Sequence, residues 1–443
     1  MNKLTIVLLL LIPVLGIGQA TPAAEQTYSI LLLGGTAHLG DGSKIEDAAI
    51  GFNKGKITYV GSMNNVDQGK WNQVINTEGK HIYPSFITVN STLGLMEIGA
   101  VRATKDYREV GRINPNVRSL IAYNTESEIT PTVRSNGVLL GQITPRGGVI
   151  SGTSSVVQFD AWNWEDAVVK EDDGIHLNWP QVFSKKREKG KTSIEEDKRH
   201  QSTKEEIVSF FEKSKAYYLS KAVILKSDVD NEEDDIIAKE MNLKYEAMIG
   251  LWSGSKTLYV HANDIKQITD AVNLKKQFKL QNMVIVGGYD SWQVADLLND
   301  NSVSVMLQRV ASLPYYHEDD YDLPYKLPRL LDEAGILFCL DNSGDMEQMQ
   351  TRNLPFYAGI AVGFGLDYEK AVQSITSSAA KILGIDDHIG TLKIGMDATL
   401  FVSEGDALDM RTNNVTFAVI DGRRITLDNR QKELYYKYKA KYR

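Results

Sequence analysis

The clearest capacity to bind a ligand lies in a glycine-rich segment that follows an apolar run. The run Val138–Ile143 is followed by Arg146, and glycines stand at positions 147, 148 and 152. Backbone N–H groups in such loops and the fork of a guanidinium group both bind anions. The segment therefore predicts a substrate-binding role for Arg146. An ordinary loop is the alternative, because no Lys followed by Ser or Thr completes a phosphate-binding loop.

Two tryptophans, Trp162 and Trp164, follow this segment closely in the sequence. Indole rings stack on sugars and aromatic ligands, and they also cover hydrophobic cores. The sequence leaves both roles open for this pair.

Another group of polar side chains stands directly after a short apolar run. The stretch from Pro84 to Val89 is largely apolar, and it is followed at once by Asn90, Ser91 and Thr92. An apolar run closed abruptly by polar residues is typical of a buried strand that delivers side chains to a site at its C-terminal end. We therefore expect these polar residues at the edge of a sheet.

The elements that would position these residues alternate between residues 85 and 385. Amphipathic stretches such as 264–280 and 291–298 separate the later strand-like runs. This alternation predicts a parallel sheet, and a (β/α)8 barrel suits the length. A doubly wound open sheet is the alternative, although no Gly-x-Gly-x-x-Gly follows a strand. The candidate strands are Val138–Ile143, Ser155–Phe159, Thr257–His261, Met283–Val286, Val303–Leu307 and Ile336–Leu340.

Several motifs resemble those of the amidohydrolase superfamily of metal-dependent hydrolases. The segment from Pro84 to Thr92 is similar to the Pro-Gly-Phe-Ile-Asp-x-His-x-His segment that opens the barrel of that family. The tail from Ile389 to Val402 resembles the family's Gly-Ser-Leu-x-x-Gly-x-x-Ala-Asp-Leu-Val signature. Residues 352–359 resemble the Asn-Leu-Pro-x-x-Ala-Gly segment of exported, imidazolonepropionase-like bacterial members.

The resemblance implies a particular division of the chain. Short strands with Gly-rich turns between residues 28 and 82 favour a small β-sandwich. In the family such strands pair with strands from the C-terminal tail. We therefore expect a composite β-sandwich formed by residues 21–84 and 386–443, and a TIM-like barrel over residues 85–385.

The same resemblance implies which residues form the site. The family's His ligands on strand one are replaced by Asn90 and Thr92, for which we expect substrate contacts. His261 matches the ligand after strand five, and Asp341 matches the catalytic acid after strand eight. A small error in register would make Asp345 that acid.

Two further ligand positions are degenerate or poorly matched. Gly287 and Gly288 stand where a His is expected after strand six. Lys226, at the end of the apolar run Ala222–Leu225, is a weak match to the ligand after strand four.

The histidines limit the metal site that the family resemblance allows. Of the seven in the chain, His176, His261 and His317 could line the barrel mouth. A two-metal site built on four His cannot be assembled from them. At most one divalent metal, Zn²⁺ first, could be held by His261, Asp341 and His176 or His317. A hydrogen-bonded core role for His261 is the alternative.

Composition and charge narrow the class of partner. The 443 residues are 42% hydrophobic and carry a net charge of -8, with a pI near 5.5. No global positive field exists to attract nucleic acid or an anionic membrane. The charged run from Ser184 to Glu206 is typical of a solvated helix face or a surface loop, and a partner-binding segment is the alternative.

The first 20 residues predict a secretory signal peptide. Lys3 precedes the apolar run Leu4–Ile17, and the small residues of Gly18–Ala20 fit a cleavage site. A retained membrane anchor is the alternative, but the run is short for a span. Cys339 is the single cysteine, which excludes an internal disulfide. We expect an exported protein, periplasmic or extracellular, that has no membrane partner once the signal is removed.

The resemblance implies hydrolysis of a carbon–nitrogen bond other than an ordinary peptide bond, such as a cyclic amide or imine. In that case Asp341 would be the general base, and His261 a metal ligand or transition-state donor. The alternative is a catalytically inactive member of the family that binds a small molecule or a partner protein at the barrel mouth, because fold does not imply function.

Overall fold

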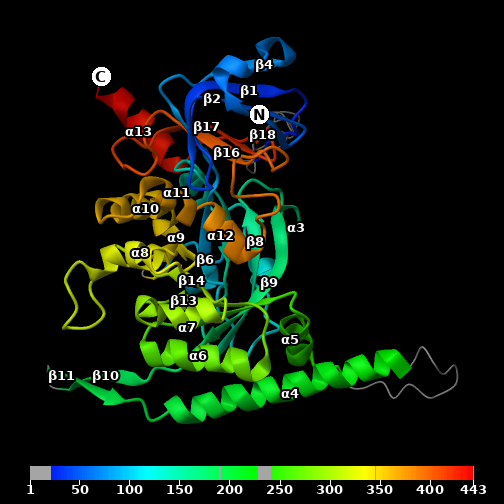
Figure 1. The fold of residues 1–443 in the computed structure, drawn as a ribbon, viewed down its shortest axis with the longest axis vertical. Helices are drawn as coiled ribbons and strands as arrows, with labels where there is room; N and C mark the ends of the chain where they lie inside the picture. Colours follow the sequence, from blue (N-terminus) through cyan, green and yellow to red (C-terminus); the bar gives the residue numbers. More distant parts are fainter. Residues whose placement is uncertain (1–20, 189–190, 228–240, 345, 443) are drawn as a thin grey trace, which may run out of the picture.

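The computed structural model describes residues 21–188, 191–227, 241–344 and 346–442. It places a sheet built by both chain ends beside a larger barrel-like sheet covered by helices (Figure 1). The predicted signal peptide falls outside the described residues. None of the helices in the described ranges is long and apolar enough to cross a membrane.

The sheet at the chain ends combines strands that are more than 300 residues apart in sequence. The tail strand β16 pairs antiparallel with β5, matching Leu400 with Pro84, and buried side chains such as Phe52, Ile82 and Val402 share one core. The strands form one eight-stranded sheet, and the second layer of the predicted sandwich stays a prediction. The strands are β1 (Ile30–His38), β2 (Lys44–Asn53), β3 (Lys56–Ser62), β4 (Gln73–Asn76), β5 (His81–Pro84), β16 (Leu400–Ser403), β17 (Val415–Ile420) and β18 (Arg423–Arg424).

The barrel sheet also has eight strands, and they follow one another in sequence order around it. Its first and last strands, β6 and β15, are joined by no backbone ladder among the described residues, so the barrel is nearly closed. The strands are β6 (Phe86–Ser91), β7 (Val138–Ile143), β8 (Ile150–Gln158), β9 (Val168–Asn178), β12 (Thr257–Ala262), β13 (Met283–Gly287), β14 (Ser304–Leu307) and β15 (Phe338–Leu340).

One strand departs from the predicted (β/α)8 pattern. β8 runs antiparallel to both β7 and β9, whereas the other neighbouring pairs are parallel. Parallel strands need a crossover of about a dozen residues or more. The connections 144–149 and 159–167 are shorter than that, so the chain turns back on itself at each. The architecture is thus a mixed α/β barrel.

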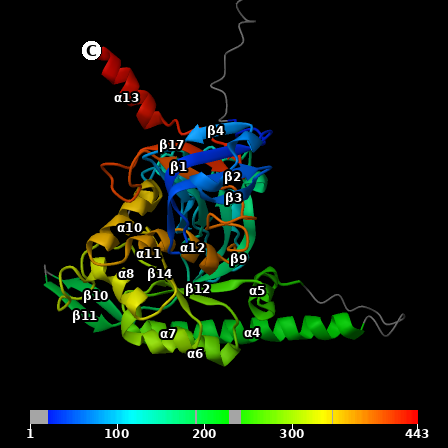
Figure 2. The same cartoon turned by 45° about the horizontal axis from the view of Figure 1, so that its top comes forward.

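The helices lie mainly along the second half of the barrel. α6 begins at a capping box, in which Asp264 accepts from the backbone of Gln267 and the Gln267 side chain accepts in return. The α-helices are α2 (Thr130–Arg134), α3 (Trp164–Ala167), α4 (His200–Ser227), α5 (Leu243–Ser253), α6 (Ile265–Phe278), α7 (Ala295–Asp300), α8 (Leu323–Glu333), α9 (Glu347–Gln350), α10 (Leu354–Gly363), α11 (Tyr368–Ser374), α12 (Ser377–Leu383) and α13 (Arg430–Lys441). Figure 2 shows α13 extending away from the body of the molecule.

Two segments differ from the sequence-based expectations. The run Ala222–Leu225, taken as a strand that ends at Lys226, is the last part of α4. A short apolar run cannot be assigned to helix or strand by periodicity alone, and here it continues a 28-residue helix. The charged run from Ser184 to Glu206 forms most of a hairpin of β10 (Phe183–Glu188) and β11 (Lys191–Glu196), and then the start of α4.

Candidate active site

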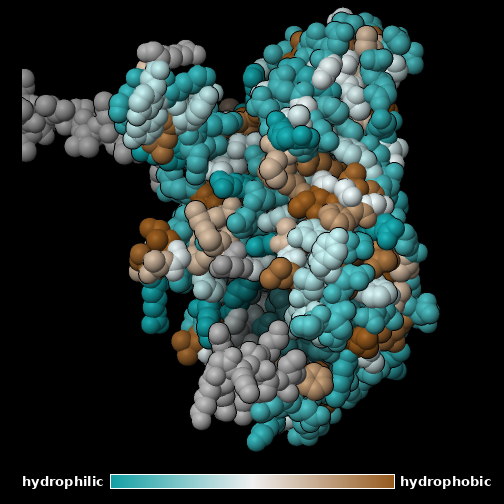
Figure 3. Space-filling view, turned by 90° about the vertical axis from the view of Figure 1, so that its left-hand side faces the viewer, coloured by the Kyte–Doolittle hydropathy of each residue, from teal (hydrophilic) through white to brown (hydrophobic). Residues whose placement is uncertain are grey.

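The polar residues after the barrel strands converge on the mouth of the barrel. The hairpin that follows β9 and the loop that follows β14 both project to the left in Figure 1. Figure 3 shows the molecule from that side, where the surface is largely hydrophilic and is hollowed toward its lower centre. The C-terminal ends of barrel strands are the usual position of an active site.

Asn90 stands at the centre of this arrangement because the backbone turns there. Its φ of 48° is left-handed, and the pairing of β6 with β7 shifts register between Thr88 and Ser91. Asn tolerates this conformation better than most residues, and such irregularities re-aim side chains beside active sites. The Asn90 amide donates to Asp341 Oδ2 at 2.8 Å, and its backbone N–H donates to Gln142 Oε1 at 3.0 Å.

Asp341 is a buried carboxylate with well-defined partners. Ser343 donates to it twice, from its backbone N–H to Oδ1 and from its hydroxyl to Oδ2, each at 2.7 Å. Burial raises the pKa of Asp341 to about 6, although the bonds from Asn90 and Ser343 and the charge of Arg146 act in the opposite direction. A carboxylate with such a pKa exchanges protons near neutrality.

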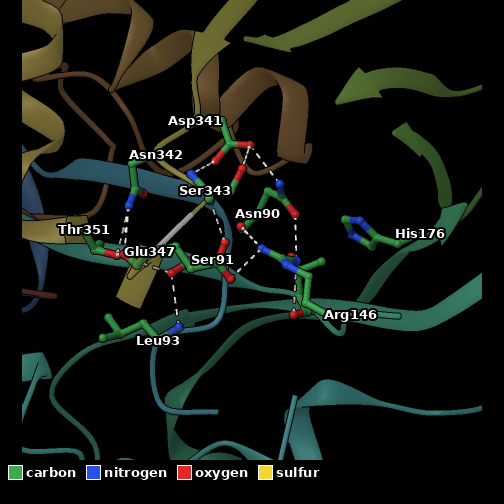
Figure 4. A network of polar contacts seen from close by, with 12 residues as sticks. Asn90, Ser91, Leu93, Arg146, His176, Asp341, Asn342, Ser343, Glu347 and Thr351 are labelled. Carbon is green, nitrogen blue, oxygen red and sulfur yellow. Dashed lines mark hydrogen bonds and ion pairs between the residues drawn. The ribbon is translucent and has the colours of Figure 1, made fainter. Parts of the chain in front are cut away.

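Arg146 reaches across the mouth from the loop after β7 (Figure 4). Its Nη1 donates to Asn90 Oδ1 at 2.9 Å and to Thr144 O at 3.4 Å, and its Nη2 donates to Asn90 O at 2.5 Å. Nη2 also lies 3.0 Å from Glu347 Oε1 in an ion pair. Both terminal nitrogens of the guanidinium are therefore engaged by the chain itself.

A chain of buried polar groups lies on the other side of Arg146. His261 Nε2 lies 3.0 Å from His176 Nδ1, and His176 Nε2 lies 3.0 Å from the hydroxyl of Ser154. Ser154 and Tyr259 both donate to the Asp173 carboxylate, at 2.7 and 2.6 Å. With Asp173 ionised, the Ser154 hydroxyl donates its proton to that carboxylate and can only accept from His176. His176 therefore donates to Ser154 and accepts from His261.

His176 and His261, the two histidines in this series of hydrogen bonds, are strongly biased toward the neutral form. Burial lowers the pKa of His261 to about 3, and the charge of Arg146 adds to the effect. The pKa of His176 is lowered well below its usual value by burial, by His261 and by Arg146. Burial raises the pKa of Asp173. The pair therefore offers hydrogen bonds and no positive charge at neutral pH.

The other predicted site residues lie in different surroundings. Thr92 is buried, and its hydroxyl has no hydrogen-bond partner among the described residues. His317 is exposed on the loop before α8, and Trp162 is 61% exposed. Asp345 falls outside the described residues. A residue larger than glycine would have little room at position 287, because a Cβ on Gly287 would lie 2.4 Å from Asn263 Oδ1.

These residues do not form a metal centre as they are arranged. Within the described ranges, no group of three His, Cys, Asp or Glu side chains could hold a metal ion. His176 and His261 bond to each other, and Arg146 bonds to Asn90 and Glu347, with Asn90 lying between Arg146 and Asp341. The donor set that the family resemblance implies for Zn²⁺ therefore does not fit, and no chemical step is routed through a metal here.

Sequence reasoning missed several members of the site. Thr88 donates to Asn342 Oδ1 at 3.0 Å, and Asn342 Nδ2 donates to Glu347 O at 3.0 Å. Asn342 follows Asp341 directly, so its position at a strand end was a usable signal. The sequence held no such signal for Ser154 and Asp173, because their roles depend on β8 and β9 lying beside β7. It held none for Glu347, because its role depends on the fold of the segment after β15.

Comparisons with known proteins agree with the fold. A model of the amidohydrolase family matches residues 325–425, whereas no curated protein matches the sequence significantly. An amidohydrolase from Thermotoga maritima MSB8 superposes with a TM-score of 0.76 and 23% identity over 90% of this chain and 99% of that one. A Xaa-Pro dipeptidase with bound methionine gives 0.54 and 13% over 89% and 99%. An ochratoxinase from A. niger gives 0.52 and 12% over 90% and 95%.

The superpositions span nearly the whole chain, and the family model covers the last barrel elements and the tail strands. The motifs around Pro84 and Ile389 that resemble the family thus lie in a shared fold. The family model over residues 325–425 and the superposed structures together support an assignment to the amidohydrolase superfamily.

Proposed function

We propose that the protein is a hydrolase that cleaves a carbon–nitrogen bond, other than an ordinary peptide bond, in a small molecule bound at the barrel mouth. The assignment to the superfamily supports a hydrolase. The similar structures include a Xaa-Pro dipeptidase and a molinate hydrolase, at 13 and 14% identity, and they carry only the fold. The observation that carries the proposal is Asp341, a buried carboxylate whose pKa of about 6 suits a general base.

In the proposed reaction Asp341 takes a proton from water, and the resulting hydroxide attacks the carbon of the scissile bond. Negative charge then develops on the oxygen or nitrogen bound to that carbon. Arg146 supplies fixed positive charge close by, and its geometry is already set by Asn90 and Glu347. The carbon–nitrogen bond breaks as the proton passes from Asp341 to the leaving nitrogen.

A second candidate is a binding protein without catalysis. It is favoured by the arrangement of Arg146, whose terminal nitrogens all have partners within the chain, and by the His176–His261 bond. In this case the mouth would bind a small molecule or a partner protein through the groups that remain accessible around it.

The two candidates differ in one assay. The purified protein is tested for hydrolysis of lactams, hydantoins and dipeptides, with and without added Zn²⁺ or Mn²⁺. A hydrolase should lose about 10²–10⁴-fold in kcat/KM on Asp341→Asn, because the base is removed. The matched control is Asp409→Asn, whose carboxylate pairs with the exposed Arg411. Absence of turnover across the panel, with a compound that raises the Tm, would support the binding protein instead.

A further inference from the structure

We propose that the guanidinium group of Arg146 is the resident cation of the barrel mouth and holds the place that a divalent metal would otherwise take. This inference rests on the proposed functional site at the barrel mouth, and it does not depend on hydrolysis. On this proposal the site needs no metal. Arg146 links the first barrel strand, through Asn90, to α9 after the last barrel strand, through Glu347.

The contacts of Arg146 resemble those of a bridging cation. Its two terminal nitrogens contact the side-chain and backbone oxygens of Asn90, which stands at the first ligand position of strand one. One of them also pairs with the carboxylate of Glu347 on α9. The strand-five and strand-eight positions, His261 and Asp341, lie near enough for the charge of Arg146 to lower the pKa of each. One guanidinium therefore contacts Asn90 directly and carries its charge close to His261 and Asp341, which are three of the family's ligand positions.

The electrostatics of the mouth require a cation at this point. Glu347 and Asp341 are almost completely buried, at 9 and 1% exposure, and both come after β15: Asp341 directly follows the strand and Glu347 begins α9. Buried carboxylates without a counter-charge are strongly destabilising. Arg146 supplies that charge at every pH of interest, because a guanidinium does not deprotonate in proteins.

The chain also builds a rigid support for this arginine. The backbone N–H of Arg146 donates to Tyr107 O at 2.7 Å, and residue 108 forms a parallel bridge with it. Gly147 follows with a φ of 89°, and a Cβ there would lie 2.9 Å from Arg108 Nε. The tight turn and its close neighbour fix the direction in which Arg146 leaves the loop.

The groups left over are unsuited to hold a metal beside Arg146. His176 and His261 share a hydrogen bond, and a side chain at Gly287 would be strained by the φ of 101° there and would crowd Asn263. A divalent ion would have to enter against the positive charge of Arg146 and displace its bonds to Asn90. The missing histidines of the family motif and the presence of Arg146 thus both disfavour a metal at the barrel mouth.

The test uses the full-length protein with Zn²⁺ or Mn²⁺ alone as the probe. Wild type is incubated with each metal and dialysed, and metal per chain is measured by mass spectrometry together with the Tm. The proposal expects no stoichiometric metal and an unchanged Tm. About one metal per chain that disappears on His261→Ala would overturn it.

Substitutions of Arg146 give a second measurement that needs no metal. Arg146→Met should lower the Tm by several degrees, because Glu347 and Asp341 lose their counter-charge. Arg146→Lys should lower it less, because it keeps the charge and loses the two-pronged geometry. The control is Arg411→Met, an exposed arginine in a surface ion pair. If Arg146→Met is as stable as wild type, the proposal is wrong; if it does not fold, Arg146→Lys and the metal measurement still decide.

A failure of this proposal and a failure of the proposed hydrolysis are distinguishable. Metal content and Tm report on the cation alone, and turnover of the substrate panel reports on hydrolysis alone. A metal-free protein without turnover would retain Arg146 as the resident cation and reject the hydrolase.

Discussion

The side-chain amide of Asn90 donates a 2.8 Å hydrogen bond to the carboxylate of Asp341. These residues lie at the ends of β6 and β15, the two strands that no backbone ladder joins among the described residues. A second bond, from Thr88 to Asn342, crosses the same seam. Side chains of the candidate site therefore complete the barrel where the backbone does not.

The first prediction concerns this seam. Asn90→Ala removes one donor to a buried carboxylate and both side-chain contacts of Asn90, so it should lower the free energy of unfolding by about 1–3 kcal/mol. Urea denaturation measures the loss. Asn65→Ala, at an exposed position, is the matched control and should change stability little. Equal effects of the two substitutions would show that the seam bond contributes nothing.

The second prediction follows from the raised pKa of Asp341. The ionised form is the base, so kcat/KM of a hydrolase should rise as the pH passes about 6, where the Asp341 carboxyl loses its proton, and then level off. The free energy of unfolding should fall over the same rise in pH. The native state holds the proton of Asp341 to higher pH than the unfolded state, so this group lowers stability as pH rises from about 4 to 6.

Asp341→Asn isolates that contribution, because an amide does not titrate. The fall in stability between pH 4 and 6 should be smaller in the variant than in wild type, as measured by urea denaturation at a series of pH values. Identical pH dependence in the two proteins would contradict the raised pKa.

The third prediction concerns acid stability and has the opposite sign. The pKa of His261 is about 3 in the folded protein, below its usual value of 6.5, because burial favours the neutral ring. The unfolded state then binds more protons between these values, so stability present above pH 6.5 is lost as the pH falls toward 3. His261→Gln should flatten this loss. His317→Gln, at an exposed loop position, is the control and should leave the wild-type profile in place.

The fourth prediction tests the ion pairs of Asp160, which link the C-terminal tail to the barrel. Asp160 is buried and accepts from Arg134 at 2.8 Å and from Arg423, which belongs to tail strand β18, at 3.0 Å. Asp160→Ala leaves two arginines without their partner and should cost about 3–5 kcal/mol of stability. Asp409→Ala, which breaks the exposed pair with Arg411, should cost about 1 kcal/mol or less. Chemical denaturation of both variants gives the comparison.

Much of the fold could be predicted because it depends on local patterns. The run Val138–Ile143 is a strand with those bounds, and Met283–Val286 and Thr257–His261 each differ from the observed strand by one residue. The amphipathic stretch 264–280 contains α6. Apolar runs of strand length and helical periodicity are properties of neighbouring residues, so they are legible without tertiary structure. The apolar run Ala222–Leu225 was misjudged because it lies inside a long helix.

Strand direction could not be predicted in the same way. β8 and β9 form an antiparallel pair, and the consecutive charged residues Lys170, Glu171, Asp172 and Asp173 of β9 lack the apolar pattern of a barrel strand. Its place in the sheet is decided by the strands on either side of it. The candidate site shares this limit, because Ser154 and Asp173 enter it only through that pair.

The sequence by itself showed the resemblance to the amidohydrolase superfamily, the polar residues that close the first barrel strand, and the absence of the family's histidines at Asn90, Thr92, Gly287 and Gly288. Those features are carried by residue types at fixed spacing. Only the tertiary structure decided what occupies the barrel mouth. Arg146 follows β7, whereas Asp341 and Glu347 follow β15, and their charges interact only after the strands bring them together. A buried charge is stable only beside its partner, and that pairing is a property of the folded chain.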